Sequence, residues 1–454
     1  MKTYQDFIKA KEENRTTDFI TQAINEYKSS AEYQIALDAD EYEAERNVTI
    51  SQFLKKLWTM DGRQTVDFTS SNSRIASNFF HRLTTQRCAY SLGNGISFAG
   101  DKNTNYTKEK LGKDFDTIMY EAAHSARLHG ESFLFWNLDH VDSFKLTEFL
   151  PLYDENDGSL KAGFRFWSLD WNQRPVTVVV YEKDGYEKYR TKSGSKGLDI
   201  TLVKPKRAYK QQIAHNEVDP DEVVGESNYS WLPIIPLWGN KHRQSDLVGM
   251  RSKIDAYDLI KSGFADTVLD CSEIYWVISN AMGETDESLA KFRDRIKTNH
   301  IAVVDTDNSP VTPYTQEIPV AARESVLKSL REQIYEDYGG LDVHTVAAGA
   351  TNDHIEAAYQ PMDEEADDFE YQIIKCIRGI LRIIGIDDVP IFNRNRVSNQ
   401  MERTQMVMLT ADHLDEETLL TKLPFVTPDE VEKIQLNKAN ESTERFSDDD
   451  EVEQ

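Results

Sequence analysis

The chain has little cysteine: 3 residues among 454, and no CxxC pair. Cys88, Cys271 and Cys376 are odd in number and far apart, which excludes a small disulfide-stapled module. This usage is typical of a protein that assembles in a reducing, intracellular compartment. At about 150 residues per domain the length predicts two to four domains, and an apolar share of 39% is enough to build buried cores.

Long hydrophobic runs are also missing. The most apolar long segment, 373–386, is interrupted by Lys375, Arg378 and Arg382 and is shorter than the roughly 20 residues that span a bilayer. The first residues contain no apolar stretch followed by a small-residue cleavage site. We therefore expect neither a signal peptide nor a membrane as a partner.

Positive charge is scarce, since 52 Lys and Arg face 78 Asp and Glu, a formal net charge of −26. Residues 301–454 carry 33 acidic and 13 basic residues, a net of −20, whereas residues 1–300 carry 45 and 39. Residues 51–100 reverse the balance, with 2 acidic and 6 basic residues. A protein that binds nucleic acid through a basic face should not have this composition. The simplest interpretation is a solvated acidic surface that keeps the chain soluble.

Catalytic motifs are absent as well. The chain contains no GxxxxGK[ST] phosphate loop, no GxSxG elbow and no HExxH pair. His124 and His129 are five residues apart and share a helix face poorly, and His344 and His354 flank a loop without other ligand residues at metal spacing. We expect no catalytic residue, no metal and no cofactor, which favours a binding, channel or assembly protein over an enzyme.

What the sequence does contain is strong helical periodicity, with apolar residues at steps of three and four. The expected helices cover 70–92, 114–128, 246–270, 319–338 and 362–386, and a more weakly patterned helical arm over 1–46 is expected to pack on another part of the protein. Gly130 and Gly339-Gly340 are expected to end two of these helices. A capping box at 427–430 predicts a last helix, and the final acidic run predicts a disordered tail.

Between Phe133 and Tyr189 the periodicity changes to two, which predicts successive antiparallel strands. Asn156-Asp157-Gly158 and Lys183-Asp184-Gly185 are the expected tight turns. A small α/β insert is expected over 272–318. Its predicted elements are strands at 274–278 and 301–304 and a charged helix at 288–296. The fold class is therefore α+β.

Several local runs occur in an order that is hard to attribute to chance. They are 71–79, 90–98, 129–134, 150–154, 232–240 (LPIIPLWGN), 245–247, 254–258, 262–266 and 318–324. Together these runs resemble the portal proteins of long-tailed bacteriophages, the head-to-tail connector rings. The resemblance covers about residues 70–430.

The resemblance implies a portal-like α+β fold with an α/β wing, a two-helix stem, a small α/β clip and a helical crown. The implied parts are an N-terminal helical arm (1–46), a wing (47–242, with 356–395), stem helices (243–271 and 319–338), a clip (272–318), a tunnel loop (339–355) and a crown with an acidic tail (396–454).

The function that the resemblance implies is a ring-shaped channel at one capsid vertex, through which double-stranded DNA is packaged and ejected. The implied partners are further copies of the chain, as a dodecamer, together with the terminase large subunit, a head-completion or adaptor protein, and the major capsid and scaffolding proteins. The implied location is the portal vertex of the virion, after assembly in the host cytoplasm. The alternatives are another ring-forming structural protein of the virion or an enzyme with an unrecognised site.

Two sets of site residues follow from the resemblance. The residues expected along the DNA channel are His344, Thr351, Asn352, Asp353 and His354 of the loop and Lys253 and Lys261 of the first stem helix. The residues expected to dock terminase or adaptor are Lys291, Arg293 and Arg295 of the clip. An acidic wall is also expected, because it would repel the DNA backbone and let it slide; its candidates are Asp337, Asp342, Asp353, Asp363 and Glu364.

Overall fold

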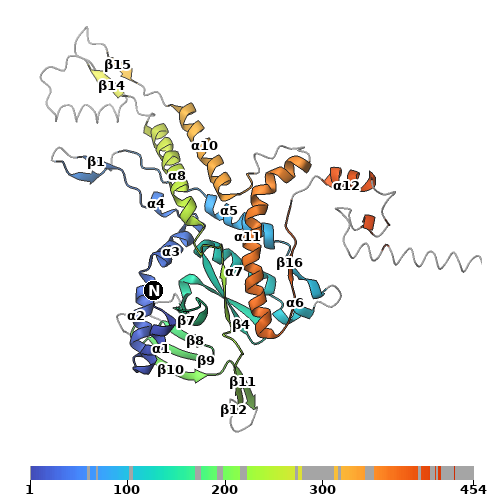
Figure 1. The fold of residues 1–454 in the computed structure, drawn as a ribbon. Helices are drawn as coiled ribbons and strands as arrows, with labels where there is room; N and C mark the ends of the chain where they lie inside the picture. Colours follow the sequence, from blue (N-terminus) through green and yellow to red (C-terminus); the bar gives the residue numbers. More distant parts are fainter. Residues whose placement is uncertain are drawn as a thin grey trace, which may run out of the picture. The chain divides into compact units, whose positions relative to one another are not determined.

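Helices and antiparallel strands are both abundant in the computed structural model, and the predicted α+β class is confirmed (Figure 1). The structure describes residues 2–58, 62–67, 70–101, 106–168, 175–191, 198–214, 222–270, 275–278, 311–314, 319–342, 352–396, 400–409, 415, 418–420 and 434. They form two compact units, the first composed of Met1–Ala39, Arg82–Val248 and Tyr335–Gln454 and the second of Asp40–His81 and Gly249–Ile334. In these described parts, no helix has the length and apolarity needed to cross a membrane.

The described helices are α1 (Tyr4–Glu12), α2 (Thr16–Lys28), α3 (Ala31–Glu43), α4 (Val48–Ser51), α5 (Phe79–Leu92), α6 (Tyr106–Leu111), α7 (Phe115–His129), α8 (Leu247–Asp270), α10 (Val320–Tyr338), α11 (Asn352–Ile384) and α12 (Gln400–Leu409). The described strands are β1 (Lys56–Trp58), β2 (Gln64–Val66), β3 (Ile96–Phe98), β4 (Glu131–Asn137), β5 (His140–Lys145), β6 (Phe149–Tyr153), β7 (Leu160–Trp167), β8 (Thr177–Glu182), β9 (Gly185–Thr191), β10 (Ile200–Arg207), β11 (Lys210–Ala214), β12 (Glu222–Ser227), β13 (Ile234–Trp238), β14 (Tyr275–Ile278), β15 (Val311–Tyr314) and β16 (Pro390–Phe392).

A five-stranded antiparallel sheet, in the order β10-β9-β8-β7-β6, lies between two hydrophobic clusters of the first unit. Successive side chains of a strand point to opposite faces. Val178 and Val180 of β8 accordingly belong to one cluster, and Val179 and Tyr181 to the other. Burial of both faces explains why β8 is buried along its whole length and why its central residues, Val178–Tyr181, form a continuous apolar run.

The N-terminal helices α1 and α2 cover one face of this sheet (Figure 1). They bury Phe7, Ile20 and Ile24 there. The ring of Phe7 lies 5.2 Å from that of Phe164 on β7 in an edge-to-face arrangement, which aromatic rings favour. Residues 4–28 of the predicted helical arm thus form helices that pack on another part of the chain.

The other face belongs to a core that also contains α7, α11 and the three-stranded sheet β13-β4-β5. Pro236 lies on β13, at the edge of that sheet, where a missing N–H removes no internal ladder bond. Gly130 ends α7 with a φ of 92°, as predicted. A Cβ at Gly130 would lie 2.7 Å from the Arg243 carbonyl oxygen. Both the positive φ and the lack of space for a side chain therefore favour glycine at this position.

Several further predictions are confirmed by the described elements. Gly158 and Gly185 have φ values of 64° and 135° at the expected turns, and Gly339 follows α10 with a φ of 65°. Helices α8 and α10 occur where their apolar stripes predicted them. The strand expected at 274–278 is β14, which pairs with β15. The expected strand at 301–304 and helices at 288–296 and after 427 lie outside the described residues.

Two predicted helix starts are wrong, and several strands were not predicted. Residues 71–78 are extended, and α5 begins only at Phe79. Helix α11 begins at Asn352, ten residues before the expected start at Met362, and continues through Pro361. The strands that were not predicted are β1, β2, β3, β5, β10, β11, β12, β13, β15 and β16. In β5, β10, β11 and β12, polar residues dilute the alternation that marks a half-buried strand.

Candidate functional site: anchoring of helices α8 and α10

The sequence-predicted channel and docking residues are only partly described. Outside the described residues lie His344, Thr351, Lys291, Arg293 and Arg295. Asn352 and Asp353 form the start of α11, and His354 is exposed in its first turn. Lys253 and Lys261 lie on α8, eight residues or about 12 Å apart along its axis. Lys253 Nζ donates to the Gly249 carbonyl (3.5 Å), and Lys261 Nζ lies 5.7 Å from the Tyr257 ring centre.

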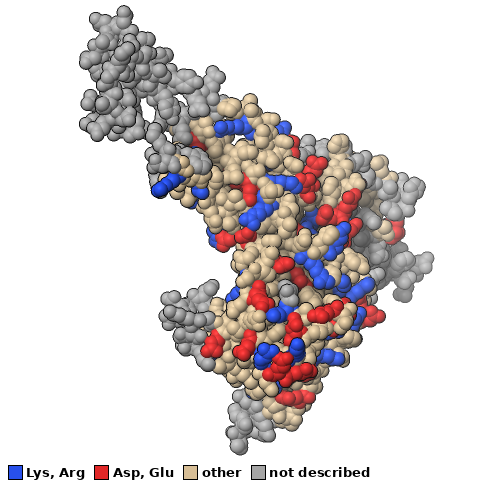
Figure 2. All heavy atoms as spheres, turned by 60° about the vertical axis from the view of Figure 1, so that its left-hand side comes forward, with Lys and Arg blue, Asp and Glu red and all other residues tan. Residues whose placement is uncertain are grey.

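The predicted acidic wall does not hold for two of its members. Asp342 is buried. Asp363 accepts hydrogen bonds from Tyr90, Arg394 and Arg396, so its charge is compensated within the chain. Figure 2 shows Lys and Arg interspersed with Asp and Glu over the described part of one face, without a continuous acidic field. Half of the net charge of −20 of residues 301–454 comes from residues 410–454, which contain 14 acidic and 4 basic residues. Most of these charged residues lie outside the described residues.

The most regular polar structure in the second unit is a ladder of hydrogen bonds between the extended 73–77 segment and α8. The backbone N–H of Ser73 donates to Asp266 Oδ1 (2.6 Å), that of Ile75 to Ser262 Oγ (3.0 Å) and that of Ser77 to Asp258 Oδ1 (3.0 Å). The three acceptors are buried and spaced four residues apart on one face of the helix.

The ladder is regular because the spacing of every second N–H along the segment matches the spacing of successive turns along α8. Two residues of extended chain advance about 6.6 Å, and four residues of α-helix advance about 6 Å. Every second N–H of the segment therefore meets a new acceptor one turn along α8. The segment forms no strand pairing, so these side chains satisfy N–H groups that burial would otherwise leave without partners.

The two carboxylates of the ladder have different electrostatic surroundings. Burial raises the pKa of Asp258, because its donors, the Ser77 N–H and the Asn47 side-chain amide, carry no charge. Burial also acts on Asp266, but the Lys55 ammonium 2.8 Å away and the Ser73 N–H outweigh it and lower the pKa of this carboxyl. Lys55 thus fixes the charge of Asp266 and ties residues 51–56 to the same helix.

In the first unit, a buried ion pair connects the start of α8 to α7. Arg127 Nε lies 2.6 Å from Asp246 Oδ2, and both side chains are almost fully buried, at 5% and 6% exposed. Arg127 also donates to the Gly239 carbonyl (2.8 Å), and the Tyr338 hydroxyl at the end of α10 donates to Asp246 (2.8 Å). One carboxylate therefore fixes the beginning of α8 and the end of α10 together.

A second buried arginine, Arg87 of α5, binds the end of α10. Its guanidinium donates to the carbonyl of Tyr338 (2.6 Å) and to Glu365 of α11 (3.1 Å). The last carbonyls of a helix lack intrahelical partners and form the negative end of its dipole, so a cation there is favourable. Helices α5, α10 and α11 thereby meet at one side chain.

A buried carboxyl group, Glu131, lies opposite Trp238 in the pairing of β4 with β13, shortly before α8. Burial raises the pKa of Glu131 to about 7, against the hydrogen bond from the Tyr153 hydroxyl and the charge of Arg243. Arg243 lies over the Trp238 ring, 3.7 Å from its centre. The proton of this group is therefore held more tightly in the folded chain than in the unfolded one.

Replacing Glu131 with glutamine is expected to make stability less dependent on pH. In the wild type, the stabilisation from the raised pKa is complete below about pH 4.3, the ordinary value of glutamate, and is lost as pH rises through about 7. Glutamine stays neutral, so Glu131→Gln should gain up to about 3 kcal/mol relative to wild type between pH 5 and pH 8. Urea unfolding at both pH values measures this, with exposed Glu109→Gln as the control. An equal difference at the two pH values would contradict it.

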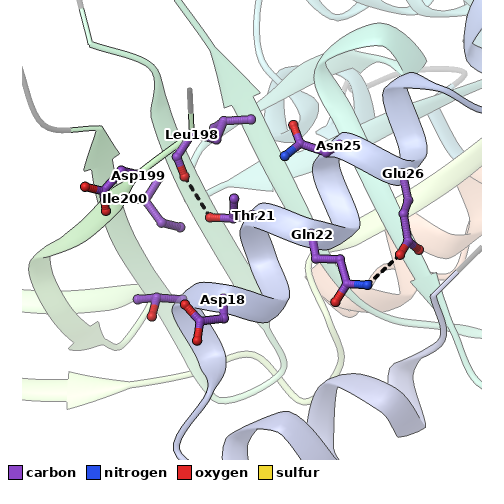
Figure 3. Close-up of a pocket in the computed structure, with 9 residues that line it drawn as sticks. Asp18, Thr21, Gln22, Asn25, Glu26, Leu198, Asp199 and Ile200 are labelled. Carbon is purple, nitrogen blue, oxygen red and sulfur yellow. Dashed lines mark hydrogen bonds between the residues drawn. The ribbon is translucent and has the colours of Figure 1, made fainter. Parts of the chain in front are cut away.

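A separate groove of about 490 Å³ lies between α2 and the start of β10 (Figure 3). Thr21 Oγ1 donates to the Leu198 carbonyl across it (2.8 Å), and Gln22 donates to Glu26 (2.7 Å). Its lining includes three carboxylates but no histidine, cysteine, lysine or arginine. These side chains offer no nucleophile with a base, and we assign no chemistry to this groove.

Comparison with known proteins identifies the class of this α+β chain. Residues 24–444 match the family model described as phage portal protein, SPP1 Gp6-like. The portal protein of Bacillus phage SPP1 is 25% identical over 410 residues, 83% of this chain and 78% of that protein. The portal protein of Clostridium phage phiCD119 is 24% identical over 449 residues, 92% of this chain and 96% of that protein. A solved structure titled "Neck of native GTA particle computed with C12 symmetry" is 10% identical with a TM-score of 0.41, covering 77% of this chain and 90% of that one.

The family model and the two related portal proteins place the molecule in the class of phage portal proteins, which are structural components of the virion. Within that class, the chain belongs to the SPP1 Gp6-like family. The resemblance noted from the sequence is thereby confirmed.

Proposed function

We propose that copies of this chain form a ring-shaped channel at one capsid vertex, through which double-stranded DNA is packaged and later ejected. The observation that carries the proposal is the family match over residues 24–444. In this ring, a dodecamer, each copy contributes α8 and α10 as staves of the channel. The ring is also the platform for terminase, head-completion or adaptor proteins, and it contacts the major capsid and scaffolding proteins during assembly in the host cytoplasm.

The parts of the ring follow from the same proposal. We assign the wing to 47–242 with 356–395, the stem to 243–271 and 319–338, the clip to 272–318, the tunnel loop to 339–355 and the crown to 396–454, behind the arm 1–46. Lys253 and Lys261 of the stem and Asn352, Asp353 and His354 of the loop would face DNA, together with His344 and Thr351.

The anchoring contacts of α8 and α10 suit helices that line a channel. A channel wall must keep its shape while a stiff polyanion moves through it. Arg127 and Asp246 hold the start of α8 and the end of α10 in one place, and the ladder holds α8 along one face. Hydrogen bonds and ion pairs are electrostatically stronger in a buried, low-dielectric environment than in water, so this wall would keep its geometry under load.

DNA that slides must not bind tightly. Non-specific affinity grows with the number of phosphates that fixed cations neutralise. Arg323, a stem cation, is engaged within the chain: its guanidinium donates to the Thr267 hydroxyl (2.7 Å). On exposed positions of α10, Lys328 lies 3.9 Å from Glu332 one turn on. Pairing of this kind lowers the number of cations that could hold the duplex.

Purified chain is expected to appear in negative-stain electron micrographs as rings with a central hole. The reason is that the proposal requires a closed cyclic assembly. Sedimentation velocity on the same sample should give one large species. Monodisperse monomers or dimers would contradict the ring and favour an enzyme or another structural role.

The loop and clip assignments are tested on such rings. Deletion of 341–355 should leave assembly intact and slow DNA packaging, because the loop is proposed to contact DNA. Charge reversal at Arg293 and Arg295 should weaken terminase binding, which is measured by co-sedimentation with assembled rings. Packaging at the normal rate, or unchanged terminase affinity, would refute the respective assignment.

A further inference from the structure

A buried carboxyl group and a buried hydrogen-bond donor lie together just before α8. Glu131, at the start of β4, is 6% exposed and pairs across the sheet with Trp238 of β13. Its carboxyl accepts a hydrogen bond from the Tyr153 hydroxyl. The indole Nε1 of Trp238 is buried and has no hydrogen-bond partner among the described residues. A buried N–H without an acceptor is unfavourable, so this donor would bind an acceptor that became available beside it.

Glu131 becomes such an acceptor when it loses its proton, because a neutral carboxyl carries a proton on one oxygen, whereas a carboxylate accepts at both. Burial raises the pKa of Glu131 to about 7, and the Tyr153 hydroxyl, the charge of Arg243 and the Trp238 N–H oppose the rise. The hydroxyl of Tyr27 on α2 is a further titratable group near Glu131. Burial raises the pKa of both tyrosines above the ordinary value. Of these groups, Glu131 alone therefore changes its charge near neutral pH.

The Trp238 indole also supports two cations. The guanidinium of Arg243 lies 3.7 Å from the centre of the indole, and the ammonium of Lys375 on α11 lies 3.9 Å from it. Both are cation–π distances, at which the aromatic face attracts the charge. A movement of the indole would therefore change the positions of Arg243 and Lys375 as well.

The loop between β13 and α8, residues 239–246, is fixed at its ends and exposed in its middle. Arg127 donates to the Gly239 carbonyl (2.8 Å) and pairs with Asp246 (2.6 Å). Between these two points, residues 241–244 are exposed. Arg243 has a φ of 53°, which is unfavourable for a residue with a Cβ and persists only where the surroundings hold it. Its contact with the indole is one such support.

We propose that this loop is a proton-operated switch: loss of the Glu131 proton brings the Trp238 N–H onto the carboxylate, and the movement of the indole releases Arg243 and opens the middle of the loop. A switch of this kind needs a local change of charge and an element with two arrangements. Glu131 supplies the change of charge, and the loop is the element. Its exposed residues Lys241 and His242 would present a different surface to a partner in the two states. The inference goes beyond the proposed function and requires only the folded chain.

Tryptophan fluorescence of the 454-residue chain, titrated from about pH 5.5 to about pH 8.5, tests the first step. Emission should change with a midpoint near pH 7, and the change should disappear in Trp238→Phe and in Glu131→Gln. Tyr153→Phe removes a donor that lowers the pKa of Glu131, so this variant should keep the transition and move its midpoint to higher pH. Exposed Glu109→Gln is the control and should titrate like the wild type. A transition that persists in Glu131→Gln, or no transition in the wild type, would overturn the inference.

Hydrogen exchange of residues 239–246, corrected for the intrinsic effect of pH on amide exchange, tests the second step. With a pKa of about 7, the charged form of Glu131 rises from about a tenth at pH 6 to about nine tenths at pH 8. The amides of Arg243 and Gln244 donate to the carbonyl and the side chain of Asn240 (3.1 and 3.2 Å). Their exchange should rise about tenfold over this range in the wild type and stay constant in Glu131→Gln.

The two measurements also separate this inference from the proposed function. A fluorescence transition without the rise in exchange would show that the loop is not the moving element and would overturn the switch. Neither measurement depends on assembly into a ring. A negative result therefore leaves the proposed ring untouched, and monomers in electron micrographs would leave the switch untouched.

Discussion

Replacing Asp246 with alanine is expected to lower the free energy of unfolding by about 3–5 kcal/mol. The substitution removes the counter-charge of Arg127, whose guanidinium is buried beside the Tyr338 and Phe369 rings. A buried charge without a partner loses its interactions with water, and no ion pair replaces them, so burial is unfavourable. The Asp246→Ala substitution also removes the acceptor of the Tyr338 hydroxyl, so the start of α8 and the end of α10 lose their shared contact. Urea unfolding of the purified 454-residue chain measures the loss.

Two further variants separate the contributions to this effect. Asp246→Asn keeps an acceptor for Tyr338 but not the charge, so most of the loss should remain. Arg127→Met combined with Asp246→Leu removes both charges and should recover more than half of it, because apolar replacement of a buried ion pair is often close to neutral. The exposed pair of Arg15 and Glu13 supplies the control: Arg15→Ala should change stability by less than about 1 kcal/mol. A change of that size for Asp246→Ala would refute the anchoring role.

Replacing Asp258 with alanine is the second large effect, with an expected loss of about 2–4 kcal/mol. The buried amide of Asn47 and the backbone N–H of Ser77 would lose their common acceptor. Each unsatisfied buried donor costs about 1–3 kcal/mol. Loss of the acceptor should also release the end of the ladder. Amide hydrogen exchange, read by mass spectrometry or NMR, should show reduced protection at Ser77 first and at Ile75 and Ser73 less strongly.

Asp258→Asn is the informative comparison for the ladder. The side-chain carbonyl of asparagine can still accept from Ser77, and burial disfavours the charge that it removes, as the raised pKa of Asp258 indicates. The amide nitrogen of this asparagine would face the Asn47 amide, which keeps only the Ser77 carbonyl as acceptor, so the loss should be about 1–2 kcal/mol, smaller than for alanine. Ser252→Ala, on an exposed position of the same helix, should leave exchange at 73–77 unchanged. Normal protection of the Ser77 amide in Asp258→Ala would show that the ladder does not hold the segment.

Local patterns of the sequence determined most of the regular elements. Apolar steps of three and four predicted α8 and α10, because each helix buries one stripe whatever it packs against. Glycine at 130, 158, 185 and 339 predicted turns and helix ends. Glycine has no Cβ and adopts the left-handed backbone conformation of these positions without a steric clash, whatever surrounds it. The ordered series of short runs was enough to identify the portal family.

The ladder shows where local patterns mislead. Ile75, Phe79, Phe80 and Leu83 have helical spacing, and the prediction therefore began a helix near residue 70, whereas 71–78 is extended. The reason is remote: the N–H groups of this segment find acceptors on α8, almost 200 residues away, so the chain gains its hydrogen bonds without forming a helix. The runs 71–79, 254–258 and 262–266 were recognised separately, but nothing in their spacing said that they bind one another.

The tertiary structure alone decided which charged residues anchor helices α8 and α10. Arg87 and Arg127 occur in helical stretches where an arginine is ordinarily on the surface, and Glu131 begins an ordinary strand. Arg87 and Arg127 are buried because α10 ends, and α8 begins, against them, a meeting of segments that are distant in sequence. The periodicity of apolar residues indicates which face of a helix or strand is buried. It does not indicate which other element covers that face. The sequence by itself therefore determined the main helices, the central strands of the large sheet and the family, and only packing determined the network that holds them together.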